Sequence, residues 1–263
     1  MIDTHAHIYL PDFTDDLGTV LSDAYTAGVD QIWLPGIDFD SLSAMESVRA
    51  HASVSNSGSM PTLRFFAGLH PCDVREDYNQ QLSLIHSALT SGTPLNSYTG
   101  IGEIGLDLYW DKTYFTQQQD ALLTQLDWAH SRNLPALIHV REAFDQIMPL
   151  IRPYYGRGLK AIFHSFAGTL DQALELTSEG FLLGINGTIT YKNSLQAKFL
   201  SQIPLSSLVT ETDAPFLTPV PFRGKRNEPK HIPLVVAKLA EIYSLSPTEI
   251  ADITTATALS LLS

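Results

Sequence analysis

The chain has 263 residues, of which 44% are hydrophobic, and its formal net charge at pH 7 is −12. This length suits one large α/β barrel or two small domains, and the hydrophobic content is sufficient for a packed core. The acidic balance excludes a basic protein that coats nucleic acid non-specifically, although an enzyme with a local basic patch stays compatible with it.

Two further features bear on where the protein works. Its single cysteine, Cys72, excludes an internal disulfide and favours a reducing, cytoplasmic setting. The first segment carries an acid and two histidines, which is not the pattern of a signal peptide, and no apolar run is long enough to cross a bilayer. We therefore expect a cytoplasmic protein without a membrane partner.

Strand-like and helix-like segments alternate along the chain. Short apolar runs predict strands at the start of the chain and at Gln31–Leu34, Arg64–Leu69, Ser97–Gly102, Pro135–Ile138, Leu159–Phe163, Phe181–Leu183 and Leu208–Thr210. Amphipathic segments predict helices at 12–28, 40–53, 78–90, Thr113–Arg132, Glu142–Tyr154, Leu170–Glu179, 194–201, Ile232–Tyr243 and 247–262. The turn residues of 54–62 predict a surface loop.

Eight strands that alternate with helices predict a single-domain (β/α)8 TIM barrel over residues 1–263, with the active site at the C-terminal ends of the strands. A doubly wound open sheet is the competing architecture. It is disfavoured because no glycine-rich phosphate-binding sequence follows the first strand.

Metal-ligand side chains follow several of the predicted strands. His5 and His7 are two residues apart, so on a strand they point to the same face. Further such residues end the fourth, fifth, sixth and eighth strands, namely Glu103, His139, His164 and Asp213. Because these strand ends meet at one face of a barrel, all six side chains are expected to converge. Four histidines and two carboxylates suit two divalent ions with positions left open for water and substrate.

Each of these residues has a simpler explanation when it is taken alone. His139 and His164 could be hydrogen-bonded core histidines, and Asp213 could cap the turn before Pro215. Glu103 resists that explanation, because a carboxylate between apolar neighbours needs a cation or hydrogen-bond donors to offset its burial. The set as a whole favours a metal centre, with Asp3 and Glu211 as groups that orient its ligands.

The segment 214–231 predicts a long functional loop, and between Arg223 and Lys230 it carries four basic residues against one acid. Basic side chains beside a metal site suit a substrate that bears phosphate, whereas a merely solvated loop is the alternative. The predicted substrate-binding residues are Arg141, Arg223, Lys225, Arg226 and His70. For His70, at the end of the third strand, a structural role is an equal alternative.

Seven short sequences occur in order along nearly the whole chain. They are Asp3-Thr4-His5-Ala6-His7, Gly68-Leu69-His70-Pro71, Gly102-Glu103-Ile104-Gly105-Leu106-Asp107, His139-Val140-Arg141-Glu142-Ala143, His164-Ser165-Phe166-Ala167-Gly168, Glu211-Thr212-Asp213-Ala214-Pro215 and Arg223-Gly224-Lys225-Arg226-Asn227-Glu228-Pro229. Together they resemble the TatD family of metal-dependent hydrolases, within the amidohydrolase-like barrels. The segment 54–62 is longer and more polar than this resemblance leads us to expect.

The resemblance implies a TIM barrel with two divalent metal ions that hydrolyses DNA phosphodiester bonds. One ion would be held by His5, His7, Glu103 and Asp213, and the other by Glu103, His139 and His164, with Glu103 as the bridge. The metal could be Zn²⁺, Mg²⁺ or Mn²⁺, because imidazoles suit zinc while carboxylates also accept magnesium and manganese.

On this hypothesis a water between the ions is the nucleophile and Asp213 is its general base, with Glu103 as the second catalytic residue. A bent loop over the pocket favours single-stranded DNA or free ends over intact duplex, which predicts an exonuclease-like deoxyribonuclease. Two other classes stay open. The same ions could serve an amidase, lactonase or ester hydrolase, including one that deacylates aminoacyl-tRNA. A non-enzymatic, metal-stabilised binding protein is disfavoured, because structural zinc sites are usually closed by four ligands.

Overall fold

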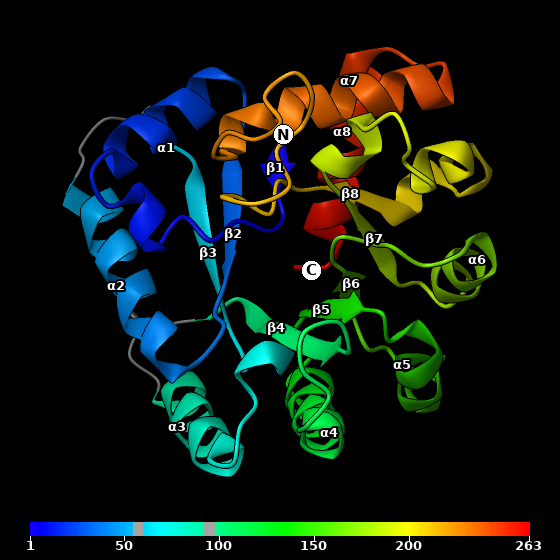
Figure 1. Cartoon of the computed structure of the whole chain (residues 1–263). Helices are drawn as coiled ribbons and strands as arrows, with labels where there is room; N and C mark the ends of the chain where they lie inside the picture. Colours follow the sequence, from blue (N-terminus) through cyan, green and yellow to red (C-terminus); the bar gives the residue numbers. More distant parts are fainter. Residues whose placement is uncertain (55–59, 92–97) are drawn as a thin grey trace.

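The strands of the sheet are all parallel and follow one another in sequence order. The structure is a computed structural model, and it describes residues 1–54, 60–91 and 98–263. The strands are β1 (Ile2–Asp3), β2 (Gln31–Pro35), β3 (Thr62–Ala67), β4 (Gly100–Asp107), β5 (Ala136–Arg141), β6 (Ala161–Phe163), β7 (Leu182–Ile185) and β8 (Leu208–Thr210). The amide of Thr4 donates to the carbonyl of Thr210, and Ala6 forms a parallel bridge with Ala214. These contacts join the first strand to the last, so the predicted barrel is confirmed (Figure 1).

The helices surround the sheet (Figure 1). They are α1 (Leu17–Thr26), α2 (Phe39–Val54), α3 (Tyr78–Thr90), α4 (Phe115–Ser131), α5 (Phe144–Ile151), α6 (Leu170–Ser178), α7 (Ile232–Tyr243) and α8 (Pro247–Ser260). Among the described residues, no helix combines the length and the apolar composition that crossing a membrane requires.

The helix predicted over 194–201 is wrong. The chain between β7 and β8 instead forms short 3-10 turns, at Gly187–Thr190, Gln196–Lys198, Leu200–Gln202 and Leu205–Ser207. Within 194–201 only Leu200 is fully buried, so the segment lacks the apolar stripe that would hold a helix against the barrel. A helix of two turns without such packing is not stable by itself.

Several predicted boundaries also move. β4 runs past Gly102 to Asp107, so Glu103 lies inside a strand, and β1 ends at Asp3, before His5 and His7. The prediction read Gly102 as a strand end, but the glycine serves close packing, because a Cβ there would lie 2.8 Å from the Cβ of Leu137. The predicted loop 54–62 and the predicted start of the fourth strand fall largely on 55–59 and on 92–97, outside the described residues.

Helix ends differ for local reasons. The helix predicted from residue 12 begins at Leu17, because Pro11 starts a separate 3-10 turn that ends at Phe13. The helix predicted over Glu142–Tyr154 is shorter, since α5 is followed by a 3-10 turn at Arg152–Tyr154.

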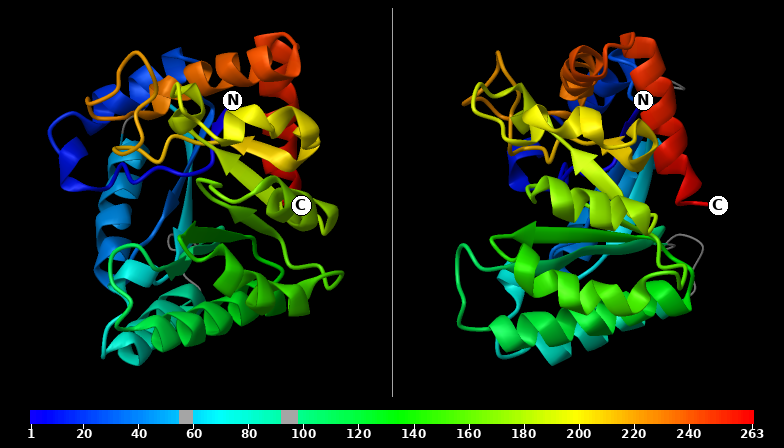
Figure 2. Two further views of the ribbon diagram at one scale, coloured as in Figure 1. Left: turned by 45° about the vertical axis from the view of Figure 1, so that its right-hand side comes forward. Right: turned by 90° about the vertical axis from the view of Figure 1, so that its right-hand side faces the viewer.

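Apolar side chains fill one half of the barrel interior. This cluster consists of Ile2, Trp33, Phe66, Leu137, Ile162, Leu182 and Val209 from the strands, with Ala258 and Leu261 from the C-terminal segment. Two residues further along a strand the side chain points to the same side. After Leu137, Ile162 and Val209 these positions hold His139, His164 and Glu211. A polar layer therefore lies directly on the apolar one, at the end opposite α8 (Figure 2).

Two buried glutamines of α4 support this polar layer from outside. The amide of Leu69, after β3, donates to Oε1 of Gln125 at 2.7 Å, and Nε2 of Gln125 donates to the Leu69 carbonyl at 3.2 Å. Gln118 makes the same pair of hydrogen bonds with the backbone of Asp107, at 3.0 and 3.2 Å. The side chains thus extend the backbone pairing of β3 and β4 where it would otherwise stop, next to His70 and Asp107.

We expect Gln125→Leu to lower the free energy of unfolding by about 2 kcal/mol, because it leaves a buried amide and carbonyl of Leu69 without partners. Urea denaturation measures the change. Gln119→Leu on the same helix is the control, since the Gln119 side chain makes no hydrogen bond in the described structure. Equal stabilities of the two variants would contradict the supporting role of Gln125.

Candidate metal centre

The six predicted ligands converge on one point at the barrel mouth. Nε2 of His5 lies 3.2 Å from Nε2 of His7, 3.1 Å from Oε2 of Glu103 and 3.8 Å from Oδ1 of Asp213. His139 and His164 approach the same carboxylate from β5 and from the end of β6. His5 and His7 come together as predicted, although the loop after β1 rather than the strand itself carries them.

The two oxygens of Glu103 divide the histidines into two sets. Oε2 faces His5 at 3.1 Å and His7 at 3.4 Å. Oε1 faces His139 at 2.9 Å and His164 at 3.4 Å. Asp213 lies on the first side, with Oδ1 at 3.5 Å from His7. A carboxylate in this position can bind one cation with each oxygen.

Neighbouring groups fix the orientation of two of the rings. The Tyr9 hydroxyl donates to the carbonyl of Pro35 at 2.8 Å, so its oxygen accepts from Nδ1 of His7 at 2.9 Å. This contact places the His7 proton on Nδ1 and turns the Nε2 lone pair toward Glu103. Nδ1 of His164 likewise lies 3.1 Å from the buried carboxylate of Glu211, which leaves Nε2 for the site.

The charge state of the cluster suits a cation. Burial and the neighbouring His164 lower the pKa of His5, so its imidazole is neutral and offers a lone pair. Burial opposes ionisation of Glu103, but its electrostatic interactions with the rings of His70, His5 and His164 outweigh burial and hold its pKa well below the usual range. Burial likewise opposes ionisation of Asp213, but His7 and His164 lower its pKa. The donors are therefore ionised carboxylates and imidazoles, the set that divalent metals bind.

The two histidines on the other side of Glu103 are more basic than an ordinary histidine. Burial disfavours a charge on His164, yet Glu211 and Glu103 raise the pKa of this histidine to about 10. Burial opposes protonation of His139 too, but hydrogen bonds to Asp107 and Glu103 raise its pKa. A metal ion bound there would displace these protons, which is how metal binding couples to ionisation. Groups of His5, Glu103 and His164, of His5, His7 and Asp213, and of His70, Glu103 and His139 each have the spacing to hold an ion.

Asp107 and Tyr9 are site residues that the sequence prediction missed. Oδ2 of Asp107 lies 3.0 Å from Nε2 of His139, and its Oδ1 accepts from the amides of Tyr109 and Trp110. Burial works against its charge, but the contact with His139 lowers the pKa of Asp107 to about 2. The sequence feature that could have identified Asp107 is an acidic residue at the end of an apolar strand.

Asp3, in contrast, stabilises backbone rather than a ligand side chain. Its carboxylate accepts hydrogen bonds from the amide and the hydroxyl of Thr212, at 2.9 and 2.6 Å. It thereby ties β1 to the segment that carries Asp213. Asp213 itself has a φ of 59°, in the left-handed region, and its amide donates to the carbonyl of His5 at 2.8 Å. Such a conformation in a non-glycine residue often marks a functional site.

His70 is held differently from the other histidines. The amide of Cys72 donates to its Nδ1 at 3.1 Å, so the proton of the neutral ring sits on Nε2. That nitrogen lies 3.4 Å from Oε1 of Glu103. In this form His70 is a hydrogen-bond donor at the site and offers no lone pair to an ion.

A pocket of about 820 Å³ opens above these side chains. Besides the metal-ligand candidates, its lining includes Arg141, Trp110 and Phe216. Arg141 stacks over the ring of Tyr109, with Cζ at 3.8 Å from the ring centroid, and no described acid pairs with it. Trp110 is 69% exposed, so the pocket combines a polar floor with an apolar rim.

The basic residues of the loop after β8 lie in different surroundings. Cζ of Arg223 is 4.6 Å from the ring centroid of Tyr191, beside the pocket, whereas Lys225 is exposed near Phe222. Arg226 turns away toward α1, where both oxygens of Asp16 accept from its guanidinium at 3.0 and 2.6 Å. It also donates to Glu228 at 3.0 Å. The structure therefore places Arg141 on the wall of this pocket and Arg223 on a neighbouring pocket that shares Thr188 and Gln196 with it, and it brings Arg226 to neither.

Comparison with known proteins places this centre in a family. The model of the family described as TatD related DNase matches residues 2–263. The metal-dependent hydrolase YabD of Bacillus subtilis is 32% identical over 257 residues, which cover 97% of this chain and 96% of the relative. A protein of Escherichia coli named the 3'-5' ssDNA/RNA exonuclease TatD is 28% identical over 248 residues, covering 91% and 90% of the two chains.

A solved structure agrees with the sequence matches. The crystal structure of YjjV, a TatD homologue from Escherichia coli, superposes with a TM-score of 0.88 at 31% identity and covers 99% of this chain and 97% of its own. The family model and the solved structure match nearly the whole chain, including every residue of the metal-ligand clusters. The protein therefore belongs to the TatD-related family of metal-dependent hydrolases.

Proposed function

We propose that the protein is a deoxyribonuclease that hydrolyses phosphodiester bonds in single-stranded DNA or at free DNA ends, in the manner of an exonuclease. The observation that carries this proposal is the division of the histidines between the two oxygens of Glu103. This centre lies next to the ionised Asp213, in a pocket lined by Arg141, for which the described residues supply no acidic partner. Paired cation sites beside positive side chains suit a phosphodiester. The name of the Escherichia coli exonuclease supports the same substrate class.

The residues present fit two divalent ions. His5, His7, Asp213 and Oε2 of Glu103 would hold one ion, and Oε1 of Glu103 would hold the second together with His139 and His164. Such ions supply positive charge that activates a water and stabilises the phosphoryl oxygens. Zinc suits the imidazoles, and magnesium or manganese suits the carboxylates, so the donor set is compatible with each of them.

Asp213 is the base of the proposed reaction. Its depressed pKa keeps it ionised at neutral pH, and it lies on the His5–His7 side of Glu103, where the pocket opens. It takes a proton from the water whose oxygen attacks phosphorus, and it can return that proton to the leaving oxygen once the P–O bond has broken. His70 directs its Nε2 proton into the pocket and would donate a hydrogen bond to a phosphate oxygen or to Glu103.

Arg141 and Arg223 are the proposed phosphate contacts. Both are exposed beside the pocket and stack on aromatic rings, which leaves the edges of their guanidinium groups free for anionic oxygens. Lys225 can add charge at the loop surface. Arg226 is no longer proposed as a substrate contact, because Asp16 and Glu228 already neutralise it.

The decisive experiment presents purified, metal-loaded protein with end-labelled single-stranded DNA, duplex DNA and RNA, and with ester and amide surrogates. We expect the fastest turnover on single-stranded DNA and a kcat lower by at least about 100-fold in Asp213→Asn, the loss expected for a general base. This variant also controls for contaminating nuclease, because it is purified in the same way. Turnover of esters or amides but of no nucleic acid would overturn the proposed substrate, and a raised KM with unchanged kcat would make Asp213 a binding residue.

Glu103→Gln tests the bridge. The neutral amide cannot bind two cations, so we expect bound divalent metal to fall and turnover to be lost. Loss of a group that only orients a ligand lowers metal affinity by about 10- to 100-fold, so loss of a bridging ligand should lower it at least as much. Elemental analysis after dialysis measures the metal content, with Asp111→Asn in the loop after β4 as an exposed acidic control. Full metal content together with full activity would rule out the bridging role.

Arg226→Met tests whether this arginine is structural. Its hydrogen bonds lower the pKa of Asp16. Burial would raise the pKa of Glu228, but the contacts with Lys230 and Arg226 outweigh burial and lower it. A carboxyl group whose pKa is lower in the folded state stabilises the protein at pH values above its unfolded-state pKa of about 4. This contribution is lost as the pH falls through the folded-state pKa. We expect Arg226→Met to cost about 1 kcal/mol near neutral pH, with the difference shrinking below about pH 4. Unfolding of both proteins across pH measures it.

Lys238→Met, which removes one exposed ion pair within α7, is the control for the loss of a surface cation. An Arg226→Met variant with unchanged stability and weaker oligonucleotide binding would instead return Arg226 to the substrate contacts.

A further inference from the structure

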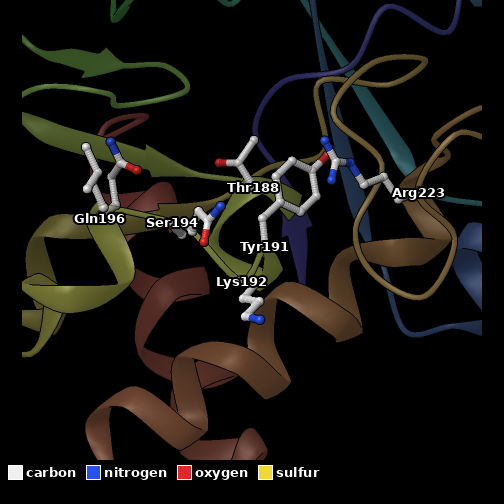
Figure 3. A pocket seen from close by; sticks show the side chains of 8 residues that line it. Thr188, Tyr191, Lys192, Ser194, Gln196 and Arg223 are labelled. Atoms are coloured by element: carbon white, nitrogen blue, oxygen red, sulfur yellow. The ribbon is translucent and has the colours of Figure 1, made fainter.

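A second pocket, of about 340 Å³, adjoins the metal centre. Thr188 and Gln196 line both pockets, so the two pockets lie side by side. Its walls come from the 3-10 turns between β7 and β8, where a seventh helix was expected, and from the loop after β8 through Arg223. Figure 3 shows Arg223 and Tyr191 on one side of this pocket and Gln196 on the other.

The lining of this pocket is suited to an anion. None of the described residues that line it is acidic, although the chain has 28 aspartates and glutamates against 16 lysines and arginines. Arg223 is its principal cation, since the side chain of Lys192 points away from Tyr191 and Arg223 (Figure 3). The structure shows no acidic partner for Arg223 among the residues it describes, and a ring contact with Tyr191 holds its guanidinium. The hydroxyl of Ser194 and the side-chain amide of Gln196 supply further donors.

The two walls are fastened to each other. The Tyr191 hydroxyl donates to the carbonyl of Thr218 at 2.9 Å, and the amide of Val220 donates to the Thr190 hydroxyl at 2.9 Å. At Gly187 a Cβ would lie 2.4 Å from the carbonyl oxygen of Leu217, so only glycine permits this approach. The pocket is therefore formed before a ligand arrives, which reduces the entropic cost of binding.

The second pocket is also tied to the metal centre. Asn186 accepts hydrogen bonds from the amide and hydroxyl of Thr188, at 3.1 and 2.8 Å. Its Nδ2 donates to Ser165 at 2.8 Å and approaches Glu211, the partner of His164, at 3.5 Å. One side chain thus sets the position of the second pocket relative to a predicted metal ligand.

We propose that the second pocket binds the phosphodiester group next to the scissile one, with Arg223 as its main contact. The inference rests on the proposed function, and it specifies the substrate as an oligonucleotide with at least two phosphodiester groups. A planar guanidinium held beside the ring of Tyr191 can present paired N–H groups to two oxygens of one phosphate. A substrate with one phosphate would leave this pocket without a ligand. The enzyme would therefore select strand length through its second pocket.

The test is a cycle that changes the protein and the substrate separately and together. The substrates are a thymidine trinucleotide and its two isomers in which one linkage is an uncharged methylphosphonate, so that each isomer keeps one cleavable bond. The variant is Arg223→Gln, and Lys198→Gln is the control, because Lys198 is an exposed cation of the same segment outside both pockets. Thermal unfolding confirms that each variant is folded.

For one of the two isomers, we expect the wild-type kcat/KM to be about tenfold below that of the native trinucleotide, the loss of one hydrogen bond to a charged group. Arg223→Gln should show the same loss on the native trinucleotide, mainly in KM, and no further loss on that isomer. Lys198→Gln should follow the wild type on every substrate.

If the losses in kcat/KM caused by Arg223→Gln and by the methylphosphonate multiply, or if the variant matches the wild type, the proposed role of the second pocket is wrong while the nuclease function stands. A wild type that hydrolyses esters or amides but no trinucleotide would overturn the nuclease function and this inference together.

Discussion

A buried negative charge at Glu103 is the constraint around which the barrel mouth is arranged. The side chain is 3% exposed, and five histidines surround it, His5, His7, His70, His139 and His164. An isolated carboxylate in such a place would become neutral, because burial without compensation costs more than protonation does. The carboxylate instead stays ionised, and the ligands around it are in turn held by Tyr9, Asp107 and Glu211. The charge of Glu103 is therefore compensated by the surrounding histidines, and these histidines are positioned by a second set of side chains behind them.

The apolar half of the barrel makes this arrangement rigid. Trp33 and Phe66 stack at 5.3 Å between ring centroids beneath the polar layer, and Gln118 and Gln125 satisfy the backbone where β3 and β4 end. Metal sites need ligands held close to their final geometry, and side chains on strands meet that need better than side chains on loops. His5, His7, His164 and Asp213 lie just beyond strand ends. For Asp213, a chain of backbone and Thr212–Asp3 hydrogen bonds fixes its loop to β1.

Much of this site could be predicted because it follows from periodicity. An apolar run that ends in histidine or glutamate identifies a strand and its ligand together, so His139, His164 and Glu103 could be assigned to neighbouring strands. The partners of Arg226 could not be predicted, since Asp16 lies more than two hundred residues away in the sequence and only the closed barrel brings the two together. The short turns in place of a helix over 194–201 escaped prediction for a similar reason. Their order comes from hydrogen bonds to the loop after β8, such as that of Tyr191 with Thr218, and not from an apolar stripe of their own.

Chemistry and substrate selection lie on different parts of the molecule. The proposed metal ligands are buried or half-buried, whereas Arg141, at the end of β5, and Arg223, in the loop after β8, are exposed and lie against aromatic rings. In a chain with a net charge of −12, most cations near an acid are neutralised, as Arg226 and Lys230 are. Among the residues that the structure describes, Arg141 and Arg223 have no acidic partner, so each leaves a positive charge that is not neutralised by a neighbouring acid. Because these exposed arginines lie outside the buried centre, a change at them can alter substrate preference without a change in the buried carboxylate and its histidines.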